Sequence, residues 1–348
     1  MRVLVTGNKG YIGTVLLEML LRKSYEVIGY DTDYYKHCDL YECAKPTKQI
    51  TKDIRDVSSR DLDGVDAVIH LAGLSNDPLG ELVPELTDIV NYRASAEFAR
   101  LAKDAGIKRF VYASSQSMYG ISNEDVELDE DDSEKNPITA YARAKWLVEK
   151  ELKELGDNNF VTVCMRPSTV FGVSPRLRCD IVFNNLVACA YTTGKIEIKS
   201  DGTPWRPVVH VRDVSNAFIA AIEAPSGLVA GRSFNIGIPD GNYTVRDLAE
   251  AAQRAVPGSS LVFTGEHGSD SRTYRVSFAR ILNTLKDYYK PEWDLDRGGM
   301  ELVQFFKKIN FTENQFRGRS CNRLQQIKYL LASEDINKDL RWSNKSGQ

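Results

Sequence analysis

The sequence predicts an α/β protein built from a doubly wound parallel sheet and a second, smaller domain that is mostly C-terminal. Through the first half of the chain, apolar runs typical of buried strands alternate with helical patterns. Such alternation indicates a parallel sheet with helices on both faces. After about residue 172 it gives way to a loop rich in Arg and Pro, which indicates a change of domain.

The same pattern predicts where each element lies. Strands are expected at residues 3–5, 27–30, 49–51, 67–71, 110–113 and 161–165. Helices are expected at residues 11–22, 86–105, 140–155, 181–193, 214–223 and 319–341. We expect the first domain to take residues 1–171, with residues 205–232 returning to it. Residues 172–204 and 233–348, the tail included, are then expected to form the second domain, over the carboxyl ends of the strands, where open α/β sheets bind ligands.

Length, charge and composition limit the function. A chain of 348 residues, 42% of them hydrophobic, can bury a substantial core. The net charge of −3 provides no general attraction to nucleic acid or anionic membranes, so small-molecule partners are expected. No apolar run approaches the roughly 18 residues of a membrane span and no signal-peptide pattern follows Met1, which predicts a cytoplasmic protein. Six scattered cysteines without a Cys-x-x-Cys pair, and only four histidines, predict reduced thiols and no metal site.

A glycine-rich turn follows the first predicted strand. Residues 6–13 read Thr-Gly-Asn-Lys-Gly-Tyr-Ile-Gly. In such a turn Gly7 is expected to leave the strand sharply, Gly10 to let the backbone approach a pyrophosphate, and Gly13 to let the helix pack closely. The following helix offers free N–H groups and the positive end of its dipole, so the turn predicts phosphate binding.

Asp31 indicates which cofactor carries that phosphate. It ends the second predicted strand about 20 residues after the glycines, where a carboxylate can accept both adenosine ribose hydroxyls. An acid there repels the 2′-phosphate of NADP, so we expect NAD(H) in a Rossmann domain. Asp53 follows a short strand and is expected to accept the adenine amino group. The small residues up to Gly73 would let the backbone run beside the cofactor.

Tyr141 and Lys145 are candidates for proton transfer. Four residues apart on one predicted helix, they lie on one face. An ammonium group near a phenol favours the phenolate and brings the tyrosine pKa down from its usual value of about 10, which makes Tyr141 a candidate general base. Ser115 and Ser117, in the loop after the strand at 110–113, can donate to a sugar oxygen or receive its proton, whereas Gln116 can only form hydrogen bonds.

Taken together, these residues resemble the extended short-chain dehydrogenase/reductases that act on nucleotide sugars. The resemblance runs in order over about the first 280 residues. It rests on Thr6-Gly-x-x-Gly-x-x-Gly13, Asp31, His70-Leu-Ala-Gly73, Ser114-Ser-x-x-x-Tyr-Gly120, Tyr141-x-x-x-Lys145, Arg166-Pro and Arg206-x-x-Val-His-Val-x-Asp213.

The resemblance implies a tightly held NAD, a small nucleotide-sugar domain and a homodimer formed through the helices at 86–105 and 140–155. It implies that Tyr141 deprotonates a sugar hydroxyl while hydride passes to NAD. It also implies that Lys145 holds the nicotinamide ribose and that Ser115 forms a hydrogen bond to the reacting oxygen. The expected cofactor-binding residues are Gly7, Gly10, Tyr11, Ile12, Gly13, Asp31, Asp53, Ile54, Leu71, Ala72, Gly73, Asn91, Ser114, Tyr141, Lys145, Pro167 and Val170. The expected substrate-binding residues are Ser75, Asn76, Ser115, Ser117, Asn185, Arg206 and Arg272. Among these, Asn185 matches a diphosphate contact of the 4-epimerases, and Arg206 and Arg272 match arginines that grip the nucleotide phosphates.

Departures from the family pattern favour one subclass. The 4,6-dehydratases carry Thr-Asp-Glu where this chain has Ser115-Gln116-Ser117, so elimination lacks its acid and its base. The 3,5-epimerase/reductases place a cysteine in this loop, which is also missing. Oxidation at C4, rotation of the 4-keto sugar and return of the same hydride need nothing that this loop lacks, so a 4-epimerase is favoured.

Two other functions stay open at this point. One is a reductase or dehydrogenase of a modified nucleotide keto-sugar that releases NAD(H) as a cosubstrate. The other is a non-catalytic NAD-sensing protein on the same fold, against which the intact pair of Tyr141 and Lys145 argues. The role of the tail and the identity of the sugar and nucleotide are left undetermined by the sequence.

Overall fold

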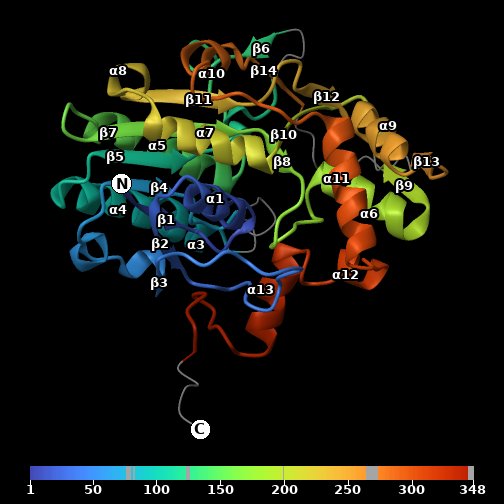
Figure 1. Cartoon of the computed structure of the whole chain (residues 1–348), viewed down its shortest axis with the longest axis horizontal. Helices are drawn as coiled ribbons and strands as arrows, with labels where there is room; N and C mark the ends of the chain where they lie inside the picture. Colours follow the sequence, from blue (N-terminus) through green and yellow to red (C-terminus); the bar gives the residue numbers. More distant parts are fainter. Residues whose placement is uncertain (76–79, 81–82, 123–125, 199, 264–272, 344–348) are drawn as a thin grey trace.

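The structure is a computed structural model that describes residues 1–75, 80, 83–122, 126–198, 200–263 and 273–343. Within these residues a seven-stranded parallel sheet has the order β11-β7-β5-β4-β1-β2-β3 (Figure 1). Its strands are β1 Arg2–Thr6, β2 Glu26–Asp31, β3 Lys48–Thr51, β4 Ala67–His70, β5 Arg109–Ala113, β7 Val161–Pro167 and β11 Arg232–Ile236.

The doubly wound fold class is confirmed. The strand order reverses between β1 and β4, which places a crevice at the carboxyl ends of these two strands. The six predicted strands of this sheet are all present. The predicted strands do not include β11, which extends the segment returning to the sheet as far as Ile236.

Helices cover both faces of the sheet, as buried parallel strands require. On one face α1 (Tyr11–Arg22) packs with α7 (Val211–Glu223) against the odd-numbered side chains of β1, such as Val3 and Val5. On the other face α4 (Ala94–Asp104) and α5 (Ala140–Leu155) cover Leu4 and its neighbours. Alternate side chains of each strand therefore enter different cores.

The helix expected at residues 86–105 is interrupted. It consists of α3 (Pro84–Thr87), a π-helical turn η3 (Asp88–Arg93) and α4. Such π turns are rare and cluster at functional sites. Here the turn carries Asn91 toward the segment that follows β4.

The second domain lies beside the carboxyl edge of the sheet (Figure 1). Its helices are α6 Val182–Thr193, α9 Val245–Ala255, α10 Ala279–Thr284, α11 Leu295–Lys308 and α12 Glu313–Arg317, whereas the short helix α8 Ser226–Val229 lies beside β7 of the main sheet. Its small sheets contain β6 Glu127–Leu128, β8 Thr169–Phe171, β9 Lys195–Ile198, β10 Trp205–His210, β12 Asn242–Thr244, β13 Ser260–Phe263 and β14 Arg275–Val276. Short 3₁₀ turns occur at η1 Ile54–Asp56, η2 Ser59–Leu62 and η4 Gln116–Tyr119.

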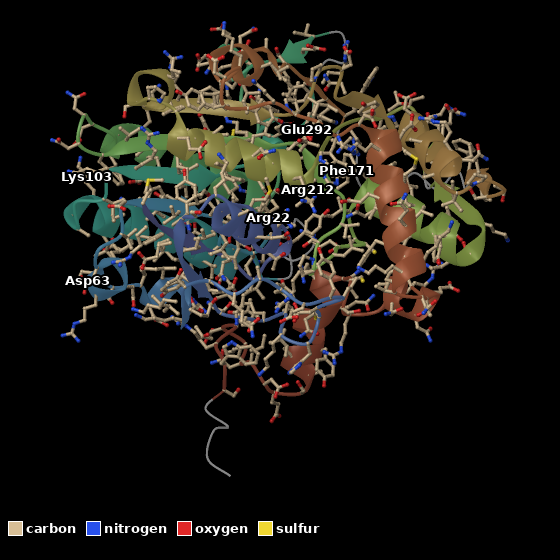
Figure 2. The ribbon with its side chains drawn as sticks, in the orientation of Figure 1. Arg22, Asp63, Lys103, Phe171, Arg212 and Glu292 are labelled. Atoms are coloured by element: carbon tan, nitrogen blue, oxygen red, sulfur yellow. The ribbon has the colours of Figure 1, made fainter. Side chains whose placement is uncertain are left out.

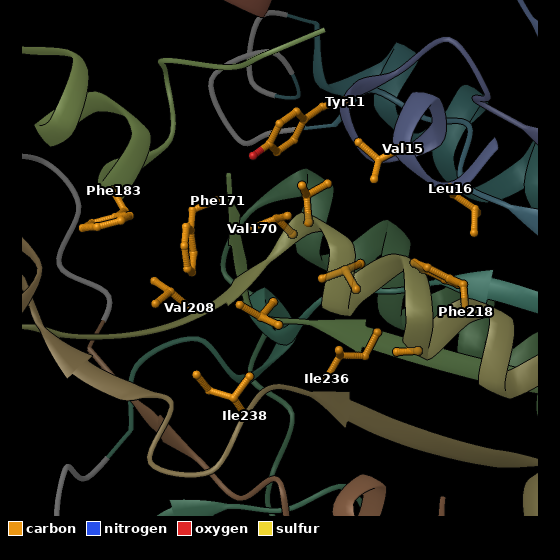
Figure 3. Close-up of a cluster of buried hydrophobic side chains, with 14 of the residues drawn as sticks. Tyr11, Val15, Leu16, Val170, Phe171, Phe183, Val208, Phe218, Ile236 and Ile238 are labelled. Atoms are coloured by element: carbon orange, nitrogen blue, oxygen red, sulfur yellow. The ribbon is translucent and has the colours of Figure 1, made fainter. Parts of the chain in front are cut away.

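Aromatic packing joins the two domains. Figure 2 shows Phe171 on the side of the second domain, whereas Asp63 and Lys103 lie at the opposite end of the main sheet. Phe171 packs edge-on against Phe183 of α6, with ring centroids 5.0 Å apart. The cluster in Figure 3 continues from these two rings through Val170 to Phe218 of α7, so a single apolar core spans the domain boundary.

The C-terminal helix is shorter than expected. It is α13 (Arg323–Ala332) rather than residues 319–341, because Glu334 adopts a left-handed φ of 56° and turns the chain back. A bridge between Ile336 and Trp342 closes this return. The segment packs on the first domain near the end of β2, with Ile336 and Leu340 buried. Among the residues that the structure covers, we find no helix with the length and apolarity of a membrane span.

Candidate active site

A cavity of about 640 Å³ opens at the carboxyl ends of the parallel strands. It passes from the turn after β1 to the loop after β5 and on to the second domain. Its lining residues come from separate segments of the chain. They include Gly7, Gly10, Tyr11, Ile12, Gly13, Asp31, Asp53, Ile54, Leu71, Ala72, Gly73, Ser75, Ser114, Ser115, Ser117, Tyr141, Lys145, Pro167, Val170, Arg178, Arg206 and Arg323.

The glycine turn has the geometry of an anion-binding loop. Gly7 has a φ of 71°, and a Cβ atom there would lie 2.8 Å from the backbone nitrogen of Ala72. At Gly13 a Cβ atom would lie 2.1 Å from the carbonyl oxygen of Gly7, so any side chain would push α1 off the turn. Gly10 caps α1, whose first turn contains no acidic residue. The N–H groups of that turn therefore face an open, electropositive position.

Asp31 lies at the end of β2 and lines the cavity. Its carboxylate accepts hydrogen bonds from the backbone N–H groups of Lys9 at 2.9 Å and Asp33 at 2.8 Å. Burial raises the pKa of Asp31, although both hydrogen bonds act to lower it. The nearby cations are engaged by other acids, since Asp33 binds the ammonium group of Lys9 at 2.5 Å and the guanidinium of Arg176 at 3.2 Å.

Asp53 caps the turn η1 and also lines the cavity. Its carboxylate accepts hydrogen bonds from Arg55 Nη2 at 2.7 Å and Arg55 Nε at 2.9 Å. Burial acts to raise the pKa of Asp53, but these bonds hold it below its ordinary value. The carboxylate is thus fixed in its charged form at the wall beside Ile54.

The segment after β4 is held from behind by Asn91. The side chain of Asn91 accepts a hydrogen bond from Leu74 N at 2.7 Å and donates one to Leu74 O at 3.0 Å. Asn91 is buried and is not among the described residues that line the cavity. It therefore fixes the backbone of residues 71–74, which does line the cavity.

Lys145 and Tyr141 occupy the inner end of the cavity, on α5. Lys145 Nζ donates to the carbonyl oxygen of Ala113 at 2.6 Å and lies 5.7 Å from the centre of the Tyr141 ring. Burial lowers the pKa of Lys145 to about 7, while the charge of Glu149 acts to raise it. The side chain is anchored to the end of β5, one residue before Ser114.

The loop after β5 brings hydroxyl groups to the same end. Ser115 Oγ accepts a hydrogen bond from Ser117 N at 3.1 Å. Within the described chain the buried Oγ atoms of Ser114 and Ser117 have no hydrogen-bond partner, although both residues line the cavity. Gln116 is turned away and donates to Arg166 O at 3.0 Å. Unpartnered buried hydroxyls at a cavity wall indicate a polar ligand.

The expected substrate-binding residues are only partly brought together. Ser75 and Arg206 line the cavity. Asn185 is absent from the described lining, because its side chain turns back and donates to the carbonyl oxygen of Cys179 at 2.8 Å. Asn76 and Arg272 lie outside the described residues.

Several lining residues were not expected from the sequence. Tyr34 and Tyr35 follow β2, Arg178 and Asp180 come from the loop before α6, and Asn322, Arg323 and Leu324 come from the C-terminal segment. The Arg-rich loop at 174–178 was recognisable in the sequence, but nothing local connected it to the cavity. The C-terminal residues carry no motif, since only the folded chain brings them to the site.

These features fit an NAD molecule. The backbone at the start of α1 can bind an anion, and Asp31 at the end of β2 provides the carboxylate expected to contact the ribose. Lys145 and Tyr141 add an ammonium group and a phenol to the same cavity. In the chain that the structure describes, no cluster of His, Cys, Asp and Glu side chains is placed to hold a metal. All six cysteines are free thiols, and all but Cys43 are buried.

Comparison with known proteins agrees with this geometry. The UDP-glucose 4-epimerase of Mycolicibacterium smegmatis is 28% identical over 326 residues, which span 88% of this chain and 99% of that protein. The structure of UDP-glucose 4-epimerase from Thermotoga maritima has a TM-score of 0.76 at 22% identity, covering 88% of this chain and 99% of that chain. The structure of DesIV, a dTDP-glucose 4,6-dehydratase from Streptomyces venezuelae solved with NAD bound, has a TM-score of 0.75 at 24% identity, with 90% and 100% covered.

The two solved structures show a shared fold, and they include both an epimerase and a dehydratase. The family itself is shown by a match over residues 3–237, which is more than half of the chain. This chain belongs to the NAD-dependent epimerase/dehydratase family, and NAD is its cofactor.

Proposed function

We propose that this protein is a nucleotide-sugar 4-epimerase. The observation that carries the proposal is the neutral loop beside Tyr141 and Lys145. There Ser114 and Ser117 present hydroxyl groups without partners in the described chain, and Gln116 faces away from the cavity. This end can bind and deprotonate a sugar hydroxyl, yet residues 114–120 of the loop, all of them described, include no carboxylate.

Proton transfer is the part of the reaction that the chain itself performs. NAD, when bound, supplies the acceptor and donor of hydride. Tyr141 takes the proton of the reacting sugar hydroxyl and returns it to the same oxygen after the 4-keto sugar has turned its other face toward the cofactor. Lys145, held by Ala113 O, favours the ionised form of the phenol in its protonated state, which is populated at and below about pH 7 in the NAD-free protein. Ser115 and Ser117 hold the reacting oxygen and its neighbour.

Elimination of water is disfavoured by the distribution of acids. The carboxylates among the described lining residues are Asp31, Asp53 and Asp180. Asp53 forms an ion pair with Arg55, and Asp180 forms one with Arg178. Asp31 ends β2, which is separated by β4 and β1 from β5, the strand whose last residue holds Lys145. A 4,6-dehydratase requires an acid and a base beside the sugar, and residues 114–120 of the described loop after β5 supply neither.

Nucleotide sugars are the proposed substrates because of the second domain. Arg206 of β10 lines the cavity and presents a guanidinium suited to phosphate. The relative from Mycolicibacterium smegmatis is named for UDP-glucose, which makes this sugar nucleotide the first to test. Assembly as a homodimer and a cytoplasmic location belong to the same proposal.

The test uses nucleotide sugars that carry deuterium at C4. The purified protein is incubated with labelled UDP-glucose, UDP-N-acetylglucosamine and dTDP-glucose, and the products are analysed by NMR and mass spectrometry. We expect the C4 epimer of at least one substrate, with deuterium retained at C4 and no net change in NADH absorbance. Tyr141→Phe is the matched control and should form no epimer.

Other outcomes identify other functions. Stoichiometric production or consumption of NADH with the sugar would indicate a dehydrogenase or reductase. A product lighter by one water would indicate a dehydratase. NAD binding without turnover of any nucleotide sugar would favour an NAD-sensing protein.

A further inference from the structure

The C-terminal segment, residues 319–343, lies outside the described sheets and reaches the cofactor cavity. Asn322, Arg323 and Leu324, at the start of α13, line the cavity together with the glycine turn. The segment lies next to Tyr34 and Tyr35, which follow the strand that ends at Asp31. It therefore stands at the adenosine side of the NAD site.

Polar contacts tie this segment to the loop after β2. Gln326 Nε2 donates to Tyr34 O at 2.9 Å, and Trp342 Nε1 donates to Thr32 O at 2.6 Å. The hydroxyl of Tyr34 donates to Leu340 O. Each contact involves the few residues that directly follow Asp31.

The segment is also tied to the turn that carries Asp53. Arg55 Nη1 donates to Asp339 O at 2.9 Å, and the guanidinium of Arg341 lies 3.6 Å from the carboxylate of Asp53. Arg341 also pairs with Asp56. Both loops expected around the adenosine half of NAD are thus held by one segment.

Arg323 brings a buried positive charge to the cavity wall. Only 2% of the residue is exposed. Its guanidinium lies 3.9 Å from the centre of the Tyr35 ring and donates to Arg176 O at 2.9 Å. The nearby Asp180 carboxylate accepts from the backbone N–H of Arg323 at 3.3 Å, and no ion pair to the guanidinium is found within the described residues. Burial lowers the pKa of Arg323 and the charges of Arg178 and Arg176 act in the same direction, whereas Tyr35 and Asp180 act to raise it. Such a charge is costly to bury unless an anion offsets it.

Arg178 lies beside it and also lines the cavity, with its guanidinium paired to the carboxylate of Asp180 at 2.8 Å, so the two arginines together exceed this one acid by a positive charge. The loop that carries Arg178 is fixed to the start of α1, since Ser174 Oγ donates to Tyr11 O at 2.8 Å. Asn184 Nδ2 donates to both Arg178 O at 2.9 Å and the Tyr11 hydroxyl at 3.1 Å. Figure 3 shows that Tyr11 points from α1 toward this side of the molecule. From there the Arg178 guanidinium reaches Ser75, beyond β4, with donor–acceptor distances of 3.4 Å to its carbonyl and hydroxyl oxygens.

Gly10 and Tyr11, at the start of α1, line the same cavity as Arg178 and Arg323. We propose that Arg178 and Arg323 bind the diphosphate of NAD and that residues 319–343 form a strap that retains the cofactor. This inference requires that NAD is the cofactor, but it does not require that the protein is an epimerase. Its test is therefore independent of the test for epimerisation.

Binding to fragments of NAD tests the diphosphate contact. Affinities for ADP-ribose and adenosine are measured by calorimetry with wild type, Arg323→Gln and Arg178→Gln. Hydrogen bonds to charged groups contribute about 1.5–3 kcal/mol, so each variant should bind ADP-ribose about 10- to 100-fold more weakly. Affinity for adenosine should change less than about twofold, because adenosine carries no phosphate.

Arg319→Gln is the matched control. Arg319 belongs to the same segment, but its guanidinium contacts Gln326 and the Tyr329 ring rather than the cavity. It should leave both affinities unchanged. Equal weakening of ADP-ribose and adenosine binding by Arg323→Gln, or no weakening of either, would overturn the diphosphate assignment.

Release of bound NADH tests the strap. Trp342 does not line the cavity, and Trp342→Phe removes its hydrogen bond to Thr32 O while keeping an aromatic ring beside Tyr34 and Lys36. Loss of one such bond should speed NADH release about 2- to 10-fold in a fluorescence chase with NAD⁺, with the association rate retained. An unchanged release rate in both Trp342→Phe and Arg323→Gln would refute retention by the strap, whether or not the protein turns over sugars.

Discussion

The ammonium group of Lys145 lies 5.7 Å from the centre of the Tyr141 ring and is fixed by a 2.6 Å hydrogen bond to the carbonyl oxygen of Ala113. Helical spacing places the two side chains on one face of α5, and the end of β5 supplies the carbonyl that holds the lysine. The pair is therefore prepared before any ligand binds, which is what a proton-transfer site requires.

Removing the phenol of Tyr141 should abolish turnover. Tyr141→Phe deletes the proposed base while keeping the ring, and general-base catalysis contributes about 10²- to 10⁴-fold to rates. We expect kcat to fall by at least this factor in the deuterium assay, with NAD content of the purified protein unchanged. Turnover at the wild-type rate would contradict the assignment of Tyr141 as base.

Lys145 should make the stability of the NAD-free protein depend on pH. Its pKa falls from 10.5 to about 7 on burial, so between these values the unfolded chain binds more protons and wild-type stability rises with pH. Lys145→Met removes this dependence. One pKa unit corresponds to about 1.4 kcal/mol, so the variant should exceed wild type by at least about 1 kcal/mol near pH 7.

The difference between Lys145→Met and wild type should be largest at and below about pH 7 and should vanish toward pH 10.5, the ordinary pKa of lysine. Urea unfolding across this range measures it. Lys150→Met, an exposed site on the same helix, is the control and should show no such trend. A difference that does not vary with pH would show that Lys145 is not desolvated.

Acidic residues after β2 should determine the preference for NAD over NADP. Asp31 occupies the ribose end of the cavity, and Asp33 engages both Lys9 and Arg176. The double variant Asp31→Ser/Asp33→Ser removes two like charges and frees Lys9 for a 2′-phosphate, while Arg176 keeps its ion pair with Asp39. We expect the ratio of NADPH to NADH affinity to rise at least about tenfold, a change of about 1.4 kcal/mol.

Fluorescence titration with both reduced cofactors provides that ratio. Asp63→Ser changes an exposed acid at the far end of the main sheet (Figure 2) and should leave the ratio as it is. The same ratio in the double variant and in wild type would show that discrimination lies elsewhere in the site.

A buried ion pair beneath the loop after β5 should be important for stability. Glu149 of α5 and Arg166 of β7 are paired at 2.6 Å, with side chains 4% and 2% exposed. Arg166 also donates to the Tyr119 hydroxyl at 2.9 Å, two residues beyond Ser117. Glu149→Gln leaves the arginine charge buried, so we expect a loss of about 3–5 kcal/mol in unfolding free energy.

Urea unfolding provides this value as well. The control is Glu154→Gln on the exposed side of α5, which should change stability by less than about 0.5 kcal/mol. A loss below about 1 kcal/mol in Glu149→Gln would mean that the site relaxes or admits water around Arg166.

Local signals in the sequence were sufficient for the fold class and for the two ends of the cavity. The turn at residues 6–13 follows from glycines whose missing side chains are a steric requirement, since a Cβ atom at Gly13 would collide with Gly7. Asp31 and the pair Tyr141 and Lys145 also follow from spacing, because strand ends and helix faces place such residues by short-range geometry. The interruption of the helix around Asn91 and the end of α13 at Ala332 did not follow, since tertiary packing determined both.

The wall of the site that faces the diphosphate was decided only by the tertiary structure. Arg178 and Arg323 are 145 positions apart in the chain, and neither belongs to a motif. They meet because one loop packs on α1 while the C-terminal segment packs on the residues after β2. Sequence patterns record contacts between near neighbours, whereas the energy of burying a charge depends on every segment that surrounds it. The sequence alone therefore determined that NAD binds, and the fold decided which residues enclose it.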